Sequence, residues 1–511
     1  MRFNLNIFLL FVFCFGNSIS LFSQTFNEHF GVFDIGWADF GYDVEYVNDS
    51  IYIIVTDQNP TGGSRLCVSN ISLTGDLVWF KCLERDTTIR GGGSNSLDAN
   101  LDHSRYVQGQ TFETVHPGTE ESLYLNELVM FDQNFDTLFT TLVGDSINFF
   151  RARQAKFTPD GGAVMVGWTH TLEPEEGPIN LFIAKFDENG NEEWQKIHST
   201  SPGSWDLGFS IEALDNGNYI VGSTTEPGWG SPNWPVITLF DNVGNYIDHR
   251  EFGNNQFFEG WASVTALADG DFVFCASKQD SFDDDRYYIV KFNEDLDVIW
   301  EKDYYFYSAE VAMVQIKENE DGTLIACGTW EDKVTTHDFG VLLKLDSNGE
   351  LLWHRLYQHA NEGFFQINRL YDVVPIPDDG GYVACGERNG PDNGQNYWVL
   401  KVDSLGCLVE GCDTITSIED IKELEQIEFI TGPNPATDYL NVFLPDIPAK
   451  FKSSPFSLEL RNTEGKTVER VSIMNYNTTI ILDVKNHPRG IYLLSLVSGG
   501  RELTTQKIII E

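Results

Sequence analysis

The stretch KENEDGTLIACGT (Lys317–Thr329), followed by LLKLDSNGELLW (Leu342–Trp353), decides the fold of this chain. It contains an apolar strand on each side of an Asp-Gly turn, and then an apolar-Lys-apolar-Asp-x-x-Gly unit that leads to a Trp. ALDNGNYIVGS (Ala213–Ser223) and ITLFDNVGNYI (Ile237–Ile247) repeat the same pattern upstream. Tight Gly-containing turns between short apolar runs indicate antiparallel hairpins, and no helical period is present.

The unit recurs along most of the chain. Its third strand ends at intervals of 52 to 60 residues, at Ser72, Asp132, Asp187, Asp241, Asn293, Asp346 and Asp403. Seven residues further on stand Trp79, Phe139, Trp194, Asp248, Trp300, Trp353 and Glu410. Four short strands at this period predict an all-β fold with a β-propeller of about seven blades. A solenoid is the alternative, although solenoids usually need capping repeats.

The two ends of the repeat region predict how the ring closes. The seventh unit breaks into GCLVEGC (Gly406–Cys412) before its Trp strand, whereas TFNEHFG (Thr25–Gly31) resembles the fourth strand of another unit, DHREFG (Asp248–Gly253). We therefore predict that Phe26–Phe30 pairs with the strand at Tyr397–Val402. This pairing would complete the last blade and remove an exposed sheet edge.

Composition and the N-terminus indicate export. The 511 residues carry 33 Lys and Arg against 77 Asp and Glu, a net charge of −44 that disfavours nucleic acid and anionic membranes as partners. Arg2 and the apolar run Ile7–Phe15 are typical of a signal peptide over residues 1–23. Further along, the sequence has no apolar run of the ~18 residues needed for a transmembrane segment, so we expect a soluble monomer.

The long, variable segments of the repeats fall on one face of the predicted propeller, where binding sites usually lie. Aromatic residues in or beside these loops could stack on sugar rings or peptides, or could instead cover the blade cores: Trp168, Trp229, Trp234 and Trp330. Asp283, Asp284 and Asp285 could bind Ca²⁺, the one candidate cofactor, or could form a solvated acidic loop. The sequence carries none of the common catalytic motifs, although a carboxylate pair could still serve a glycosidase.

Cysteine positions suggest disulfides in an oxidising exterior. Cys407 and Cys412 lie in one short Gly-containing loop and are predicted to pair. Cys67 and Cys82 lie on successive predicted strands and could also pair if their Cα atoms approach within ~7 Å.

The C-terminal segment carries three separate motifs in order. These are GPNPATDYLNV (Gly432–Val442), LRNTEGKTV (Leu460–Val468) and GIYLLSLVSGGRELTTQKIIIE (Gly490–Glu511). Together they resemble the type A sorting domain of the type IX (Por) secretion system of Bacteroidetes. The resemblance implies an immunoglobulin-like sandwich and transport through the periplasm and across the outer membrane, with release or surface attachment. The positions that carry its motif are Pro433, Asn434, Pro435, Gly490, Tyr492 and Lys507.

These observations predict a signal peptide (1–23), a propeller (24–412), a linker (413–431) and a sorting domain (432–511). The leading hypothesis is a secreted or surface-attached, non-catalytic propeller that binds glycan or protein through its long-loop face. The alternatives are a polysaccharide hydrolase or lyase on the same scaffold, and a structural or adhesive surface protein. Aromatic or acidic residues that converge at the channel mouth would favour the first two hypotheses.

Overall fold

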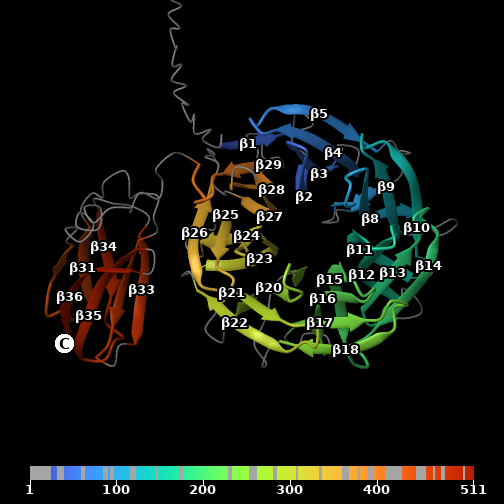
Figure 1. Cartoon of the computed structure of the whole chain (residues 1–511). Helices are drawn as coiled ribbons and strands as arrows, with labels where there is room; N and C mark the ends of the chain where they lie inside the picture. The colour runs from blue at the N-terminus through green and yellow to red at the C-terminus, as the bar shows by residue number, and fades with distance from the viewer. Residues whose placement is uncertain are drawn as a thin grey trace, which may run out of the picture.

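The computed structural model contains strands and turns but no helix in the residues it describes. These are residues 25–511 except 32–38, 59–63, 84–89, 93–96, 116–121, 145–147, 172–176, 228–232, 253–261, 280–284, 306–308, 333–336, 359–366, 378–379, 390–394, 409–428, 445–455, 464–465, 474–477 and 499–500. Seven antiparallel sheets follow one another around a ring in chain order (Figure 1). The predicted all-β fold and seven-bladed propeller are therefore confirmed. The predicted signal peptide lies outside the described residues.

Each sheet is one blade, and blades 1, 3, 4, 5 and 6 have four strands in sequence order. Blade 1 comprises β2 (Asp39–Val47), β3 (Ser50–Gln58), β4 (Ser64–Ser72) and β5 (Leu77–Cys82). Blade 3 comprises β11 (Asn148–Phe157), β12 (Ala163–Thr171), β13 (Asn180–Phe186) and β14 (Glu192–His198). Blade 4 comprises β15 (Trp205–Ala213), β16 (Tyr219–Glu226), β17 (Trp234–Phe240) and β18 (Tyr246–Glu251). Blade 5 comprises β19 (Ser263–Ala266), β20 (Phe272–Gln279), β21 (Asp285–Phe292) and β22 (Val298–Tyr304). Blade 6 comprises β23 (Ala309–Glu318), β24 (Leu324–Asp332), β25 (Asp338–Leu345) and β26 (Leu351–Tyr357).

Blade 2 departs from the four-strand pattern. Its inner edge is formed by two short strands, β6 (Arg90–Gly92) and β7 (Asp98–Ala99), and both pair with β8 (Arg105–Val115). The blade continues through β9 (Ser122–Asp132) and β10 (Thr137–Val143). In blade 1, Cys67 of β4 and Cys82 of the neighbouring strand β5 form a disulfide.

Blade 7 closes the ring as predicted. β27 (Asn368–Pro375), β28 (Tyr382–Asn389) and β29 (Gln395–Val402) are joined by β1 (Phe26–Phe30) from the N-terminal end of the described chain. β1 is antiparallel to β29, with Phe26 opposite Lys401 and Phe30 opposite Tyr397.

The recurring turn of the repeat connects the third and fourth strands of a blade and packs against the preceding blade. The leading Asp accepts backbone hydrogen bonds from the residues two and four positions later, as Asp346 does from Asn348 and Glu350 (both N–Oδ1 2.8 Å). The Gly that follows has a positive φ, +77° at Gly349, a region that costs other residues energy. The same Gly lies against the Trp of the preceding blade, with Trp300 under Gly349 and Trp353 under Gly406. In blade 7, Phe26 takes the place of that Trp and lies against Gly75 of blade 1.

This packing gives a first prediction. A Cβ added at Gly349 would lie 2.9 Å from Trp300 Cζ3, so Gly349→Ala must both strain the turn and displace the indole. We expect a loss of about 2–4 kcal/mol in unfolding free energy, measured by urea denaturation. Gly322→Ala is the matched control, since Gly322 has a similar φ of +76° but no atom within 4 Å of the added Cβ. Equal losses in the two variants would contradict the role of this inter-blade contact.

Two further sheets form a sandwich toward the C-terminus. One contains β30 (Ile430–Gly432), β31 (Tyr439–Leu444) and β34 (Thr478–Asp483). The other contains β32 (Phe456–Arg461), β33 (Thr467–Ile473), β35 (Gly490–Ser498) and β36 (Arg501–Ile510). Alternating residues of both sheets point inward, as β31 shows with Leu440, Val442 and Leu444 buried and Tyr439 exposed.

Candidate functional site

The inner strands of the blades share a local irregularity that builds the central channel. β2, β11, β15, β23 and β27 each contain a β-bulge at the same place in the repeat. The extra, unpaired residues are Tyr42, Arg153, Phe209, Val314 and Tyr371. A bulge redirects side chains, so five blades present one additional side chain near the ring axis.

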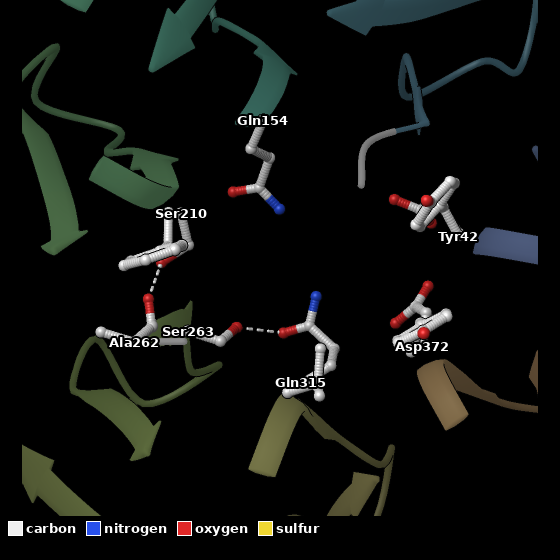
Figure 2. A pocket seen from close by; sticks show the side chains of 11 residues that line it. Tyr42, Gln154, Ser210, Ala262, Ser263, Gln315 and Asp372 are labelled. Carbon is white, nitrogen blue, oxygen red and sulfur yellow. Dashed lines mark hydrogen bonds between the residues drawn. The ribbon is translucent and has the colours of Figure 1, made fainter. Parts of the chain in front are cut away.

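In blades 1, 3, 4 and 7 the residue after the bulge links its blade to the next one. Asp372 Oδ2 accepts a hydrogen bond from Val44 N (3.0 Å), and Asp43 Oδ2 accepts one from Leu97 N (2.9 Å). Gln154 Oε1 likewise accepts a hydrogen bond from Ile211 N (2.7 Å). These side chains converge from different blades (Figure 2). Together with Tyr42, Phe209 and Tyr371, they line a cavity of about 20 Å³, which has room for one water molecule but not for a sugar ring.

Charged side chains continue the channel toward the tight-turn face. Lys317 Nζ lies 3.0 Å from Asp372 Oδ2, and Lys156 Nζ lies 3.4 Å from Asp98 and 3.8 Å from Glu212. Burial raises the pKa of Glu45 to about 7, although Lys317 opposes this shift. Burial, and then the neighbouring Asp372, raise the pKa of Asp43. A polar and ionic network thus links neighbouring blades along the channel.

The face of the long loops is different, because aromatic and basic side chains gather there around the channel. The inner strands run from this face to the tight-turn face, so their first halves lie at its mouth. Tyr42 stacks on Tyr371 (ring centroids 5.5 Å apart) and on Phe40 (5.6 Å). The Arg153 guanidinium lies 5.5 Å from the ring centroid of Phe209. We call Tyr42, Arg151, Arg153, Phe209, Tyr371 and Glu387 the mouth cluster.

Glu387 is held by its neighbours within the mouth cluster. Tyr371 Oη donates a hydrogen bond to Glu387 Oε1 (2.6 Å), and Arg369 Nη1 lies 3.6 Å from the same oxygen. Arg369 also donates through Nε to Asp338 Oδ2 (2.6 Å). Burial raises the pKa of Glu387, which these two partners oppose. Oε1 of the carboxylate is therefore already occupied by groups of the protein, whereas the buried Oε2 meets no hydrogen-bond donor among the described residues.

Burial also shapes the basic side of the mouth cluster. It lowers the pKa of Arg153 to about 10, and the like charge of Arg151 lowers it further in the same direction. Burial and Glu387 raise the pKa of Tyr42 to about 12, whereas Arg153 and Arg151 oppose that shift. At neutral pH the Tyr42 hydroxyl is protonated and Arg153 is cationic. This side of the mouth can therefore donate hydrogen bonds and attract an anion.

An aromatic ladder adjoins the mouth cluster between blades 2 and 3. Phe149 is parallel to His170 (centroids 4.8 Å apart) and to Trp168 (5.2 Å), and it also contacts Tyr124 (4.4 Å). The Arg151 guanidinium lies 5.7 Å from the Trp168 ring centroid, which joins the ladder to the mouth cluster. Among the described residues, the indole N–H of Trp168 meets no hydrogen-bond acceptor.

The structure places the aromatic residues that the sequence singled out in different blades. Trp168 is 7% exposed and belongs to the ladder. Trp330 is 6% exposed and packs against Phe339 between blades 5 and 6. Trp234 begins β17 and packs on the core between blades 4 and 5, while Trp229 lies outside the described residues. The three described ones, Trp168, Trp234 and Trp330, are not brought together, and the role of all four in binding stays a prediction.

The other predicted site residues are only partly described. Asp285 is buried at the start of β21, whereas Asp283 and Asp284 lie outside the described residues. Within the described ranges, no three His, Cys, Asp or Glu side chains cluster as metal ligands would. Cys407 is disulfide-bonded, but Cys412 falls outside the described residues, so their pairing remains a prediction.

The mouth cluster was missed from sequence, although a signal was present. YDV occurs at residues 42–44 and again at 371–373, one repeat position in neighbouring blades. The Tyr is the bulged residue and the Asp is the inter-blade acceptor in both copies. A bulge cannot be seen in the sequence, so the two Tyr residues read as ordinary strand residues.

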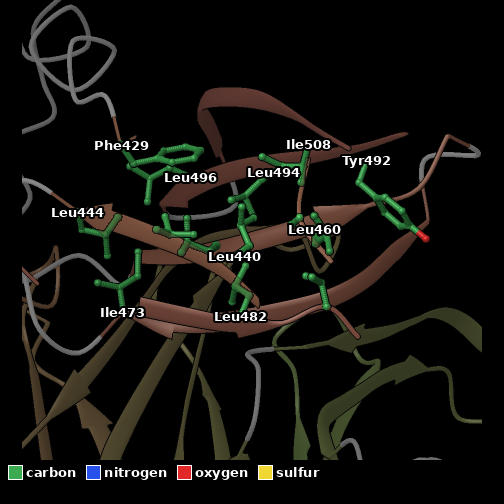
Figure 3. Close-up of a cluster of buried hydrophobic side chains, with 14 of the residues drawn as sticks. Phe429, Leu440, Leu444, Leu460, Ile473, Leu482, Tyr492, Leu494, Leu496 and Ile508 are labelled. Atoms are coloured by element: carbon green, nitrogen blue, oxygen red, sulfur yellow. The ribbon is translucent and has the colours of Figure 1, made fainter. Parts of the chain in front are cut away.

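The C-terminal motif residues serve the sandwich itself. Asn434 Nδ2 donates to Lys507 O (2.7 Å) and Asn434 Oδ1 accepts from Ile509 N (2.9 Å), so this side chain pairs with β36 as a strand would. Gly490 begins β35, and Tyr492 closes one end of the apolar core while its hydroxyl donates to Pro488 O (2.6 Å; Figure 3). Pro433 and Pro435 flank Asn434.

Solved structures with a similar arrangement are remote. They include the β-propeller domain of the Trilobed protease from Pyrococcus furiosus (10% identical, TM-score 0.39, covering 75% of this chain and 99% of that chain). A BP39L lectin from Burkholderia pseudomallei is 9% identical, with a TM-score of 0.45 and coverage of 73% and 98%. A protein of unknown function from Dyadobacter fermentans is 10% identical, with a TM-score of 0.41 and coverage of 63% and 96%. At these scores the similarities carry no functional argument.

No curated protein sequence matches this chain. Across the described ranges, no helix is long and apolar enough to span a membrane. Residues 433–511, by contrast, match the family of the secretion system C-terminal sorting domain, as the three motifs led us to expect. The end of the chain is therefore a type IX secretion sorting domain, and the propeller in front of it is cargo for export to the cell surface or beyond.

Proposed function

We propose that the protein, exported through a signal peptide at 1–23 and a sorting domain at 432–511, acts as a non-catalytic binding module. Its propeller (24–412) recognises a glycan through the long-loop face. One observation carries this proposal: aromatic rings and guanidinium groups from blades 1, 3, 4 and 7 converge around the channel mouth. Half-buried rings offer flat apolar faces to sugar rings, and nearby donors fix orientation.

Binding is favoured over hydrolysis by where the carboxylates lie. A glycosidase needs two carboxyl groups, about 5–10 Å apart, that both reach the scissile bond. Asp43 and Asp372 surround a cavity of about 20 Å³, and Glu387 is only 1% exposed and held by Tyr371 and Arg369. These acids stabilise the blades in the arrangement described, with no room for a sugar between them.

The test is a glycan-array screen of the purified protein that retains its C-terminal domain, combined with an assay for newly released reducing ends. We expect saturable binding without product. Phe209→Ala and Tyr371→Ala are each expected to weaken binding about tenfold or more, since stacking and hydrogen-bonding contacts at such a site are worth about 1–3 kcal/mol.

Tyr246→Ala is the matched control. Tyr246 is a half-exposed aromatic residue at the start of β18, beside a tight turn on the opposite face. Its substitution should leave binding unchanged. Release of reducing ends would instead establish a hydrolase or lyase. Absence of any glycan binding would overturn the proposal and leave protein recognition or adhesion.

A further inference from the structure

We infer that a crevice between blades 1 and 2 is a second binding site, which takes a small aromatic molecule that carries no acidic group. The crevice lies between strands β4 and β5 of blade 1 and strands β9 and β10 of blade 2, at the outer rim of the ring (Figure 1). Its volume is about 610 Å³, within the range of about 300–1,000 Å³ that is usual for small-ligand sites. The lining residues that the structure describes include no member of the mouth cluster, so the two sites are separate.

Comparison of the repeats shows what sets this interface apart. Two positions meet between neighbouring blades: one at or just after the end of the fourth strand, and one on the third strand of the next blade. Around the ring, the residues at these positions are Phe30 with Cys67, Leu83 with Glu127, Val143 with Phe182, His198 with Val236, Phe252 with Tyr288, Tyr304 with Val341, and Tyr357 with Trp398. Every pair supplies at least one aromatic ring except Leu83 with Glu127, which belongs to blades 1 and 2.

The missing ring accounts for the open space. In blade 5 the ring of Tyr304 is buried against blade 6, where its hydroxyl donates a hydrogen bond to Gly349 O (2.6 Å). In blade 1 the corresponding residue is Leu83, which is shorter and only partly buried. Across the interface, Glu127 is 4% exposed and accepts a hydrogen bond from Gln110 Nε2 (2.6 Å), so its side chain is held within its own blade. A ring supplied by a ligand would therefore occupy the place that the protein fills at its other interfaces.

The lining of the crevice defines the chemistry of the ligand. Apolar side chains from both blades line it: Leu66, Val68, Leu83, Phe131 and Phe135. Exposed polar side chains line it as well: Lys81, Asp136, Thr137 and Thr140. A ligand with a flat apolar body gains from contact with the first group, and a hydroxyl on that body can bond to the threonines.

The charges at the crevice favour an aromatic ring over a saturated one and disfavour an acid. The Lys81 ammonium is attracted to the face of an aromatic ring but not to a saturated ring of the same shape. Its charge is balanced by the ion pair with Asp136, so it gives no preference for an anion. The whole chain carries 77 acidic against 33 basic residues, and this excess repels anionic ligands at low ionic strength.

The experiment measures binding of three matched probes to the full chain by ligand-observed NMR titration: 2-naphthol, its saturated counterpart decahydro-2-naphthol, and 2-naphthoate. We expect 2-naphthol to bind saturably and the saturated ring to bind about two- to fivefold more weakly, the difference that a cation–π contact at an exposed site supplies. 2-Naphthoate should bind about threefold or more weakly at low salt, and salt at about 0.5 M should reduce that difference.

Two variants place a ring in the crevice, one from each blade. Leu83→Tyr restores the residue that blades 5 and 6 carry at this position, and Thr140→Phe fills the space from β10. Each should weaken binding of 2-naphthol about tenfold or more, because a filled crevice leaves no room for the probe. Leu138→Tyr is the matched control, since Leu138 is half-exposed on the same strand and does not line the crevice. None of the three should change glycan binding at the channel mouth.

The outcomes separate this site from the mouth cluster and from other occupants. Binding of 2-naphthol that persists unchanged in both Leu83→Tyr and Thr140→Phe would overturn the inference, as would the absence of binding. Equal affinity for decahydro-2-naphthol would show a merely apolar crevice and overturn the aromatic assignment. If a Trp-containing peptide bound with the same dependence on Leu83 while no free aromatic molecule did, the occupant would be a protein and the small-molecule assignment would be wrong.

Discussion

Phe26→Ala should strongly destabilise the propeller by loosening its closing blade. Phe26 is 7% exposed and packs in one apolar cluster with residues of blades 1 and 7, among them Val55 and Val399. It also fills the place that a Trp fills in blades 3, 5 and 6. Truncating a buried Phe costs about 3–5 kcal/mol, which we expect as a lower urea midpoint.

The same substitution should loosen the whole terminal strand. β1 is held to β29 by its ladder and by Asn27 Oδ1, which accepts a hydrogen bond from Trp398 Nε1 (2.6 Å). Detachment would expose the edge of β29 and promote association, so light scattering should show oligomers. Glu28→Ala, an exposed change on the same strand, should have no effect. An unchanged midpoint together with unchanged amide exchange at Tyr397–Lys401 would contradict closure by β1.

Stability should fall as pH rises from about 4.5 to about 7, and Glu45→Gln should remove much of that fall. The pKa of Glu45 is raised from 4.5 to about 7 by burial in the channel. The folded state therefore binds a proton that the unfolded chain has released across this interval, and unfolding free energy decreases as pH rises. The shift corresponds to about 3 kcal/mol, which solvent reaching the partly exposed carboxyl reduces to about 2.

The measurement is urea denaturation from about pH 4 to about pH 8. We expect Glu45→Gln to match the wild type at the acidic end and to exceed it by about 2 kcal/mol at the basic end. Burial also raises the pKa of Asp43 and Glu212, so a smaller slope should remain in the variant. Glu294→Gln, at an exposed turn, should reproduce the wild-type curve. Parallel curves for Glu45→Gln and the wild type would show that this carboxyl does not cause the slope.

The architecture could be predicted from the amino-acid sequence, because the features that specify a blade are local. An Asp that caps its own turn and a Gly that must adopt a positive φ recur in most blades, as at Asp346 and Gly349. The repeat also revealed its missing strand, so that β1 could be assigned to β29 before any contact was known. The sorting domain was recognisable for a related reason, since its motifs are contiguous in the chain.

Some departures from the repeat pattern are compensated by residues of a neighbouring blade. In blade 4, Asp248 stands where most other blades have a Trp or Phe. In blade 5, Leu296 stands where the corresponding turn of most other blades has Gly. In the structure Leu296 adopts a φ of 61° and is buried between blades 4 and 5, while Arg250 donates to its carbonyl (Nη1–O 2.8 Å). A leucine from one blade thus replaces the aromatic residue of another, a compensation between positions that are far apart in sequence.

The candidate site, by contrast, depends on the tertiary structure. Tyr42, Arg153, Phe209 and Tyr371 come from four blades and meet because each is the extra residue of a bulge, a feature set by strand register and not by residue type. Trp330 is conspicuous in the sequence, but it is packed between blades 5 and 6. The bulged residues are less conspicuous in the sequence, yet they surround the channel mouth. Local turn chemistry fixes the shape of each blade, whereas a binding surface depends on which side chains of separate blades face one another once the ring has closed.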